Sequence, residues 1–368
     1  MNFDDCAMQA RWKTVLNKKR AWVGLDGFVD RLVSVVKRRE GQGNQFEAYS
    51  TLTELGQRIC KASGCNLNLE LFPKCEKIGG NGPLLTGVLL AMGANVHYVG
   101  TLGNPIHPLF ETFARKTQAI SLGAPGRTQA LECHDGKLLL GYTYPMDEVN
   151  YENLLRQKSK KYWIDEFSKS DLIAFQNWTM LYGMTHLLQI IADEWLPHLS
   201  PNDHRIWFFD LADPSKRTRE DLQKLLQILP RLGCKGKVYL ALNRSEAKIV
   251  GETVGIPCHS EIEGDRMDFQ RWLCTLKEKL NIDCVVYHCH VGAVAVNQDE
   301  MTFVPAFKAK QLRCLTGSGD HFNGGFLCGR LMNFDLEQSL LLGHSIAVLY
   351  IETGCVPSDE NIQKYLNR

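Results

Sequence analysis

From about residue 162 onward, short apolar segments alternate with longer amphipathic ones, and this pattern most limits the folds open to the chain. The apolar segments have four or five residues each, typical of strands buried on both faces: 172–175, 206–210, 238–242, 284–287 and 293–296. The longer segments have helical spacing of apolar residues: 184–195, 219–229, 269–280, and two that begin at Asp320 and Leu336. The alternation predicts an α/β fold, with a mostly parallel sheet and helices on both faces.

The first 150 residues predict further elements of the same kind. In chain order they are a strand over 21–36 broken by a turn at Asp26-Gly27, a helix over 47–62, an apolar helix over 84–93 and a strand over 96–100. Asp135-Gly136, between two apolar segments, is a strong hairpin signal. Ligands of parallel sheets bind at the carboxyl ends of the strands, so functional residues are expected there.

Composition and charge exclude several classes of function. The formal net charge of +1, with no long basic run, argues against a nucleic-acid partner. The 13 cysteines are scattered and form no CxxC pair, so we expect reduced thiols rather than a disulfide framework or zinc ribbon. The N-terminus lacks the apolar core of a signal peptide, and no apolar run approaches the roughly 18 residues of a membrane span. We therefore expect a cytoplasmic protein without a membrane partner.

The segment Gly317-Ser318-Gly319-Asp320 carries the strongest chemical signal. Small residues before a helix can turn their N–H groups toward one point, where the helix dipole also favours an anion. Asp320 would then lie in the first helical turn, where a carboxylate is placed to take a proton from a hydroxyl. The alternative interpretation is a capped helix after a glycine-rich turn.

Two other segments suggest ligand contacts. Gly79-Gly80-Asn81 precedes the apolar helix, and its glycines allow the backbone to approach a ligand closely. Asp26 and Asp30 lie across a strand–loop junction and could accept hydrogen bonds from sugar hydroxyls, although Asp26-Gly27 is equally typical of a tight turn. His288 and His290 suggest a metal site only weakly, because Cys289 points to the opposite face of the strand.

Two common phosphate-binding signatures are absent: the chain has no GxxxxGK[ST], and neither glycine-rich segment completes GxGxxG. Instead, the two glycine loops and the alternating core resemble the ribokinase-type (PfkB) carbohydrate kinases. Asn243 and Glu246 match the NxxE motif of that family. The resemblance implies one ribokinase-like domain over residues 1–368, with a small β-containing lid from parts of 31–50 and 128–146. Many relatives build lid strands in this part of the chain, but here we expect residues 31–77 to be helical.

The resemblance also implies roles for individual residues. Asp320 would be the general base, and Gly317, Ser318 and Gly319 would form an anion hole. The substrate-binding candidates are Asp30, with Asp26 second, Gly79, Gly80, Asn81 and Asn104. The nucleotide-binding candidates are Asn243, Gly292, His344 and Ala347, and Glu246 would help to hold Mg²⁺ through water.

The function implied is the Mg²⁺- and ATP-dependent phosphorylation of a sugar or sugar-like alcohol. Two alternatives stay open: a nucleoside kinase of the adenosine type, favoured by the spacing of Asp26 and Asp30, and a sugar- or nucleotide-binding regulator without catalysis. The partners expected are small molecules, and the exposed edge of the hairpin near Asp135 suggests a homodimer.

Overall fold

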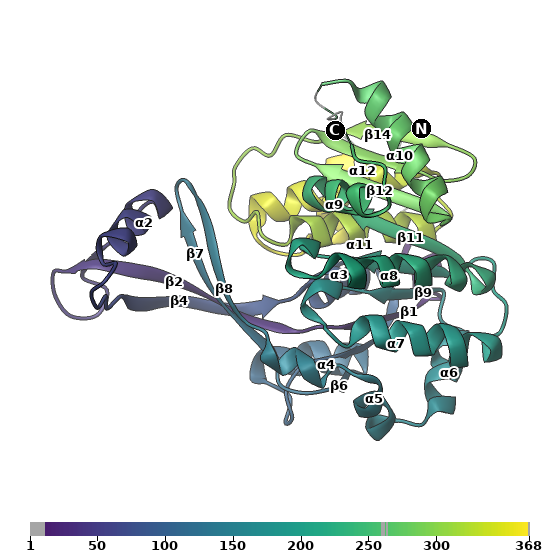
Figure 1. Cartoon of the computed structure of the whole chain (residues 1–368), viewed down its shortest axis with the longest axis horizontal. Helices are drawn as coiled ribbons and strands as arrows, with labels where there is room; N and C mark the ends of the chain where they lie inside the picture. The colour runs from purple at the N-terminus through teal and green to yellow at the C-terminus, as the bar shows by residue number, and fades with distance from the viewer. Residues whose placement is uncertain (1–11, 259–261, 263, 367–368) are drawn as a thin grey trace.

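The computed structural model describes residues 12–258, 262 and 264–366, and these residues form two sheets of very different size (Figure 1). Within the described residues, the main sheet has nine strands in the order β14-β13-β12-β11-β10-β9-β1-β5-β6. Their bounds, in chain order, are β1 Arg20–Leu25, β5 Asn95–Gly100, β6 Ile120–Ser121, β9 Leu172–Phe175, β10 Ile206–Asp210, β11 Lys237–Leu242, β12 Cys284–Cys289, β13 Gly292–Val296 and β14 Met301–Pro305.

The strands of the main sheet run parallel to one another except β13, which lies antiparallel to both of its neighbours, β12 and β14. The carboxyl ends of the central strands therefore meet at one edge. Polar residues leave the sheet there: Asp26 follows β1, Gln176 follows β9, Asp210 ends β10 and Asn243 follows β11. The predicted α/β architecture with a mostly parallel sheet is confirmed.

Helices cover both faces of the main sheet, and each face has its own apolar core. One face is covered by α5 Tyr151–Gln157, α6 Lys160–Lys169, α7 Met184–Ile190, α8 Arg219–Leu232, α9 Arg244–Thr253 and α10 Arg266–Leu280. The other is covered by α3 Asn81–Ala91, α4 Glu111–Thr117, α11 Ser318–Leu331, α12 Leu336–Thr353 and α13 Asp359–Leu366. Because α3 and α11 lie together, their first turns reach the same part of the carboxyl edge.

The smaller sheet forms a lid that projects away from the main body (Figure 1). Its strands are β2 Phe28–Arg39, β3 Phe46–Ala48, β4 Glu70–Gly79, β7 Gly126–Cys133 and β8 Gly136–Tyr142. Strand β2 pairs with β4 on one side and with β7 on the other, and β7 and β8 form the predicted hairpin. Helix α2, Leu52–Lys61, packs on one face of this sheet through Leu55.

The expectation that residues 31–77 are helical was wrong. Strands β2, β3 and β4 run through that segment and cover more of it than α2, its one helix among the described residues. Helix α2 also begins at Leu52 rather than 47, because β3 lies before it and Thr51 caps its first turn. The lid thus includes β4, which lies outside the two segments assigned to it from the sequence.

Among the described residues, no helix combines the length and the apolar character that crossing a bilayer requires.

Candidate active site

Two cavities adjoin at the carboxyl edge of the main sheet. The larger has a volume of about 1380 Å³ and lies between the end of β12, the loop after β14 and helix α12. The smaller has a volume of about 530 Å³ and lies under the first turns of α3, α9 and α11. Asn243, Ser245, His288 and Gly319 line both cavities, so a ligand in one can reach a ligand in the other.

The glycine-rich segment lies where these two cavities meet. Gly317 is the N-cap of α11 with φ of 89°, a left-handed conformation that glycine adopts without strain. Gly319 lines both cavities, and Asp320 follows in the first turn of the helix with its side chain almost fully buried. The structure thus brings together the four residues predicted as anion hole and base.

Asp26 is fully buried and holds the first turn of α3. Its carboxylate accepts hydrogen bonds from the backbone N–H groups of Asn81 and Gly82, both at 2.9 Å, and from Asn177 Nδ2, also at 2.9 Å. The hydroxyl of Tyr98 donates to it as well, at 3.4 Å, so all of these donors belong to the protein. This geometry gives Asp26 a structural role as the cap of α3.

Asn81 connects that turn to the predicted base. Its Nδ2 donates to Asp320 Oδ1 at 2.9 Å, and its side chain lines the smaller cavity beside Asp320. Gly79 and Gly80 lie directly before it, and a Cβ at Gly79 would overlap the carboxylate of Asp30. The early glycine loop therefore packs between Asp30 and Asp320.

The smaller cavity is strongly acidic. Asp210, Asp213, Glu246 and Asp320 line it. Burial, and then the charges of Asp210 and Asp26, raise the pKa of Asp320 well above its usual value. Burial and the charge of Asp210 raise the pKa of Glu246 in the same direction, and burial raises the pKa of Asp210 to about 6. Carboxylates that repel one another in a buried place favour a bound cation.

Asn323 contacts this acidic wall through Asp210. Its Nδ2 donates to Asp210 Oδ2 at 3.0 Å, while its buried Oδ1 has no hydrogen-bond partner among the described residues. No group of three or more His, Cys, Asp or Glu side chains in the described part of the chain is arranged to hold a metal ion by itself. The donor set thus fits a hydrated divalent cation that takes its remaining ligands from water and phosphate oxygens.

The raised pKa of Asp210 predicts a pH-dependent stability. Its folded-state pKa of about 6 exceeds the ordinary value of 3.8, so its contribution to stability is fully present below about pH 3.8 and is lost as pH rises through about 6. In EDTA at pH 7.5, Asp210→Asn should therefore melt a few degrees above the wild type, and this difference should shrink toward pH 4. Differential scanning fluorimetry measures both. The exposed Asp203→Asn is the control, and equal melting of Asp210→Asn and wild type at pH 7.5 would contradict the prediction.

Asn243 and Glu246 form a capping box at the start of α9. Asn243 Oδ1 accepts from Glu246 N at 3.1 Å, and the Glu246 carboxylate accepts from Asn243 N at 2.9 Å and from Asn243 Nδ2 at 2.6 Å. The NxxE spacing thus has a local structural reason. Because both residues also line the smaller cavity, the predicted metal and phosphate roles stay compatible with it.

The larger cavity has a partly aromatic wall, and its charged lining residues are all basic: Arg244, Lys248 and Lys308. His344 and Ala347 of α12 line it, with Phe307 and Phe322 nearby. Burial lowers the pKa of His344 and of His288 to about 4, so both imidazoles are neutral at pH 7. Cys289 and Val291 line the cavity, but Gly292, the first residue of β13, does not.

The remaining substrate candidates, Asp30 and Asn104, line neither of the two cavities. Asp30 is on β2 of the lid, and burial raises its pKa, while a hydrogen bond from Thr128 and the charge of Lys77 oppose that rise. Asn104 is exposed, lies in the loop after β5 and lines neither cavity. The structure therefore does not bring Asn104 to the residues around Asp320.

Sequence reasoning missed several residues at this site. Asp210 and Asn177 lie at the carboxyl ends of strands, and that position was a signal that could have identified them. Lys137 of β8 gave no such signal: its Nζ donates to Thr316 Oγ1 at 2.7 Å and so joins the lid to the segment before α11. Lys77 of β4 makes a second contact of this kind, to Cys314 Sγ at 3.5 Å.

Known proteins resemble this chain over nearly its whole length. Residues 4–368 match the family model of the prokaryotic ketohexokinases. A ketohexokinase from Haloferax volcanii is 23% identical over 349 residues, which cover 94% of this chain and 90% of that protein.

Solved structures agree on the fold. A ribokinase from Arabidopsis thaliana, complexed with ribose and ATP, has a TM-score of 0.64 at 12% identity, covering 95% of this chain and 99% of its own. A nucleoside kinase from Burkholderia thailandensis, in complex with inosine, has a TM-score of 0.59 at 15% identity, with 95% and 97% covered. The predicted ribokinase-like fold is confirmed. Since the family model spans almost all of the sequence, the chain is a carbohydrate kinase that belongs to the prokaryotic ketohexokinase family.

Proposed function

We propose that this protein transfers the γ-phosphoryl group of ATP to a hydroxyl of a ketohexose or a closely similar sugar, with Asp320 as general base. The observation that carries the proposal is the place of Asp320. It is buried in the first turn of α11, directly after a glycine-rich N-cap, in an acidic cavity that adjoins a second cavity of nucleotide size. A carboxylate beside an anion cradle is the arrangement that phosphoryl transfer to an alcohol requires.

Each group has a defined part in this proposal. The raised pKa of Asp320 makes its carboxylate a stronger base for the sugar hydroxyl once it is ionised. Asn81 orients that carboxylate through its hydrogen bond to Oδ1. The backbone N–H groups of the segment Gly317–Gly319 stabilise the negative charge of the transferred group. We assign Asp30 of the lid as the hydrogen-bond acceptor for a second hydroxyl of the sugar, one that is not phosphorylated.

The nucleotide belongs in the larger cavity. Its neutral histidines and aromatic side chains suit a purine base, and its junction with the smaller cavity at Gly319 would allow the phosphates to lie beside Asp320. Asp210 and Glu246 would hold Mg²⁺, and Asp213 of the same cavity would be a further acceptor for its water ligands. When bound, Mg²⁺ neutralises phosphate charge and lowers the repulsion among these carboxylates.

An ADP-release assay on the purified chain tests the proposal. The panel should contain fructose and other ketohexoses, ribose, glucose and adenosine, each with ATP and Mg²⁺. We expect turnover with at least one ketohexose and little with adenosine. Preferred turnover of adenosine would support the nucleoside-kinase alternative instead. No ADP release with any sugar or nucleoside would contradict the proposal and favour the non-catalytic binder.

A further inference from the structure

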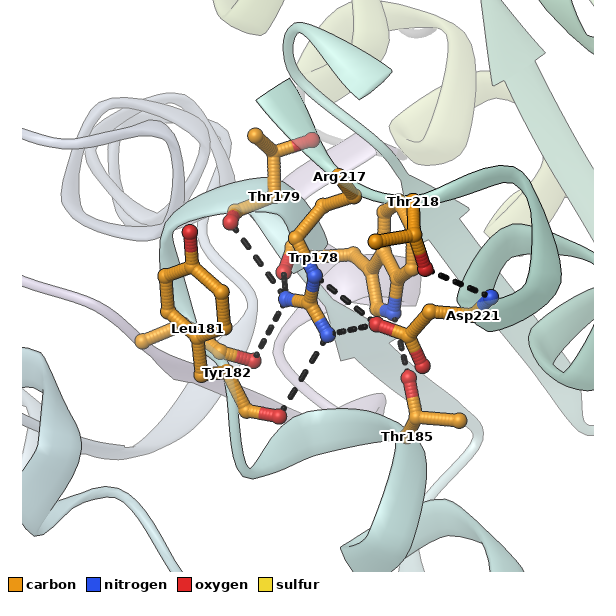
Figure 2. A network of polar contacts seen from close by, with 8 residues as sticks. All are labelled: Trp178, Thr179, Leu181, Tyr182, Thr185, Arg217, Thr218 and Asp221. Atoms are coloured by element: carbon orange, nitrogen blue, oxygen red, sulfur yellow. Dashed lines mark hydrogen bonds and ion pairs between the residues drawn. The ribbon is translucent and has the colours of Figure 1, made fainter. Parts of the chain in front are cut away.

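The side chain of Arg217 lies almost fully buried between the loops that follow β9 and β10, and it donates hydrogen bonds to four carbonyl oxygens of the first of these loops (Figure 2). Its Nη1 donates to the carbonyl oxygens of Trp178, Thr179 and Leu181 at 3.0, 3.4 and 3.3 Å, and its Nη2 donates to Tyr182 O at 3.4 Å. These carbonyl groups belong to the connection between β9 and α7, which has no ladder partners of its own.

Two further contacts fix the guanidinium in this position. It lies between the rings of Trp178 and Tyr182, with its central carbon 4.4 and 4.5 Å from the ring centroids. Asp221 of α8 accepts from Nε at 2.8 Å and pairs with Nη2. A planar, stacked fork of this kind is specific to arginine, because a lysine ammonium can neither stack in the same way nor reach as many acceptors.

The loop that Arg217 holds begins with Asn177. This residue has φ of 58°, a left-handed conformation that depends on the surrounding structure, and its Nδ2 donates to Asp26 Oδ2. Asp26 accepts from the backbone N–H of Asn81, and the side chain of Asn81 donates to Asp320. A continuous series of contacts therefore runs from Arg217, through the loop, Asp26 and Asn81, to Asp320.

We propose that Arg217 is a positioning residue for Asp320. By fixing the loop 177–182 it keeps Asn177 on Asp26, and Asp26 in turn keeps the first turn of α3, with Asn81, in register with the carboxylate of Asp320. Arg217 itself lines neither cavity and so touches neither substrate. The inference rests on the proposed function, because it assumes that Asp320 is the base.

The test is a double-mutant cycle. Arg217→Ala removes the fork, and Asn177→Gly removes the amide while it preserves the left-handed backbone. Each single variant should lower kcat on the order of 10-fold or more, as expected for a misplaced reacting group, while KM for ATP changes little. Because both act on the same series of contacts, the double variant should be about as slow as the slower single variant. Arg219→Ala is the matched control, since this neighbouring arginine is exposed and bonds to Glu252 O, so its kcat should equal that of the wild type.

Chemical rescue separates positioning from simple destabilisation. Low millimolar guanidinium chloride should restore part of kcat in Arg217→Ala, by entering the space between the two rings, and should leave Asn177→Gly unchanged. A variant that is merely less stable would gain nothing from guanidinium. If Arg217→Ala does not fold, Arg217→Lys serves in the same cycle, and its kcat should again fall without a further loss on adding Asn177→Gly.

Several results would overturn the inference: wild-type kcat in Arg217→Ala, multiplicative losses in the double variant, or no rescue by guanidinium. These differ from failure of the proposed function, in which the wild-type protein itself would turn over no substrate.

Discussion

Asp320→Asn should lose sugar phosphorylation on the order of 10²- to 10⁴-fold in kcat, the usual contribution of a well-placed general base. The asparagine side chain has nearly the same shape and still offers an oxygen to Asn81 Nδ2, so the contact at 2.9 Å can persist. What disappears is the group that takes the hydroxyl proton. The measurement is initial-rate ADP release at saturating ATP and sugar, with the sugar identified in the panel assay.

The stability and ATP binding of Asp320→Asn distinguish loss of the base from loss of the fold or of the nucleotide site. Asp320 has a raised pKa because it is buried next to Asp210 and Asp26, so removing its charge relieves repulsion. Asp320→Asn should therefore be at least as stable as the wild type at pH 7.5, and it should retain ATP binding by calorimetry. Glu166→Gln is a matched control: this buried carboxylate lies in α6, remote from the two cavities, and kcat should not change. Near-normal turnover of Asp320→Asn would show that the base is another residue.

The position of Asp320 in the first turn of a helix was easier to predict than its surroundings, for physical reasons. A left-handed N-cap, a helix N-terminus and an acid in the first turn are all local features, so Gly317 and Asp320 could be identified from the sequence. The acidic wall is non-local: Asp210, Glu246 and Asp320 come from three elements that meet only when the sheet forms. Asp210 appeared in the sequence only as the last residue of a strand.

The lid was predicted poorly because its strands are stabilised in an unusual way. Much of β4 and the last three residues of β2 are exposed, so apolar residues do not alternate regularly along them. Cross-strand ion pairs, Arg31 with Glu76 and Arg39 with Glu70, join the two strands where apolar contacts would usually do so. Arg, Lys and Glu favour helices intrinsically, and this preference produced the wrong helical expectation for residues 31–77.

For Asp26, the residue type and its position in the sequence were not enough to predict its role. Its type and position suggested a sugar-binding carboxylate or a turn, and the structure gives a third role, the cap of α3. That role connects it to catalysis indirectly, because the same turn carries Asn81. A buried acid near an active site can therefore bind the substrate directly or hold the residues that do so. Its hydrogen-bond donors distinguish these two roles.

Gly317→Ala should have the second-largest effect, a loss on the order of 10²-fold in kcat. Gly317 has φ of 89°, where an L-residue costs roughly 1–2 kcal/mol, and a Cβ would lie 2.7 Å from Leu84 Cδ1. The leucine side chain can rotate away, but the backbone strain is relieved only if the N-cap moves. That movement displaces the amide donors, and one lost donor of this kind costs on the order of 10²- to 10³-fold. Initial rates at saturating substrate measure the loss.

Gly255→Ala isolates the catalytic part of this effect from the backbone strain. Gly255 has φ of 81°, a Cβ there would meet nothing within 4 Å, and the residue lies after α9 outside both cavities. Both alanine variants should thus lose a similar amount of stability to the left-handed backbone, on the order of 1 kcal/mol. Only Gly317→Ala should lose turnover, since only there does the strained backbone carry the donors for the phosphoryl group. If both variants kept wild-type kcat, the glycine-rich segment would be a helix cap and nothing more, which is the alternative that the sequence left open.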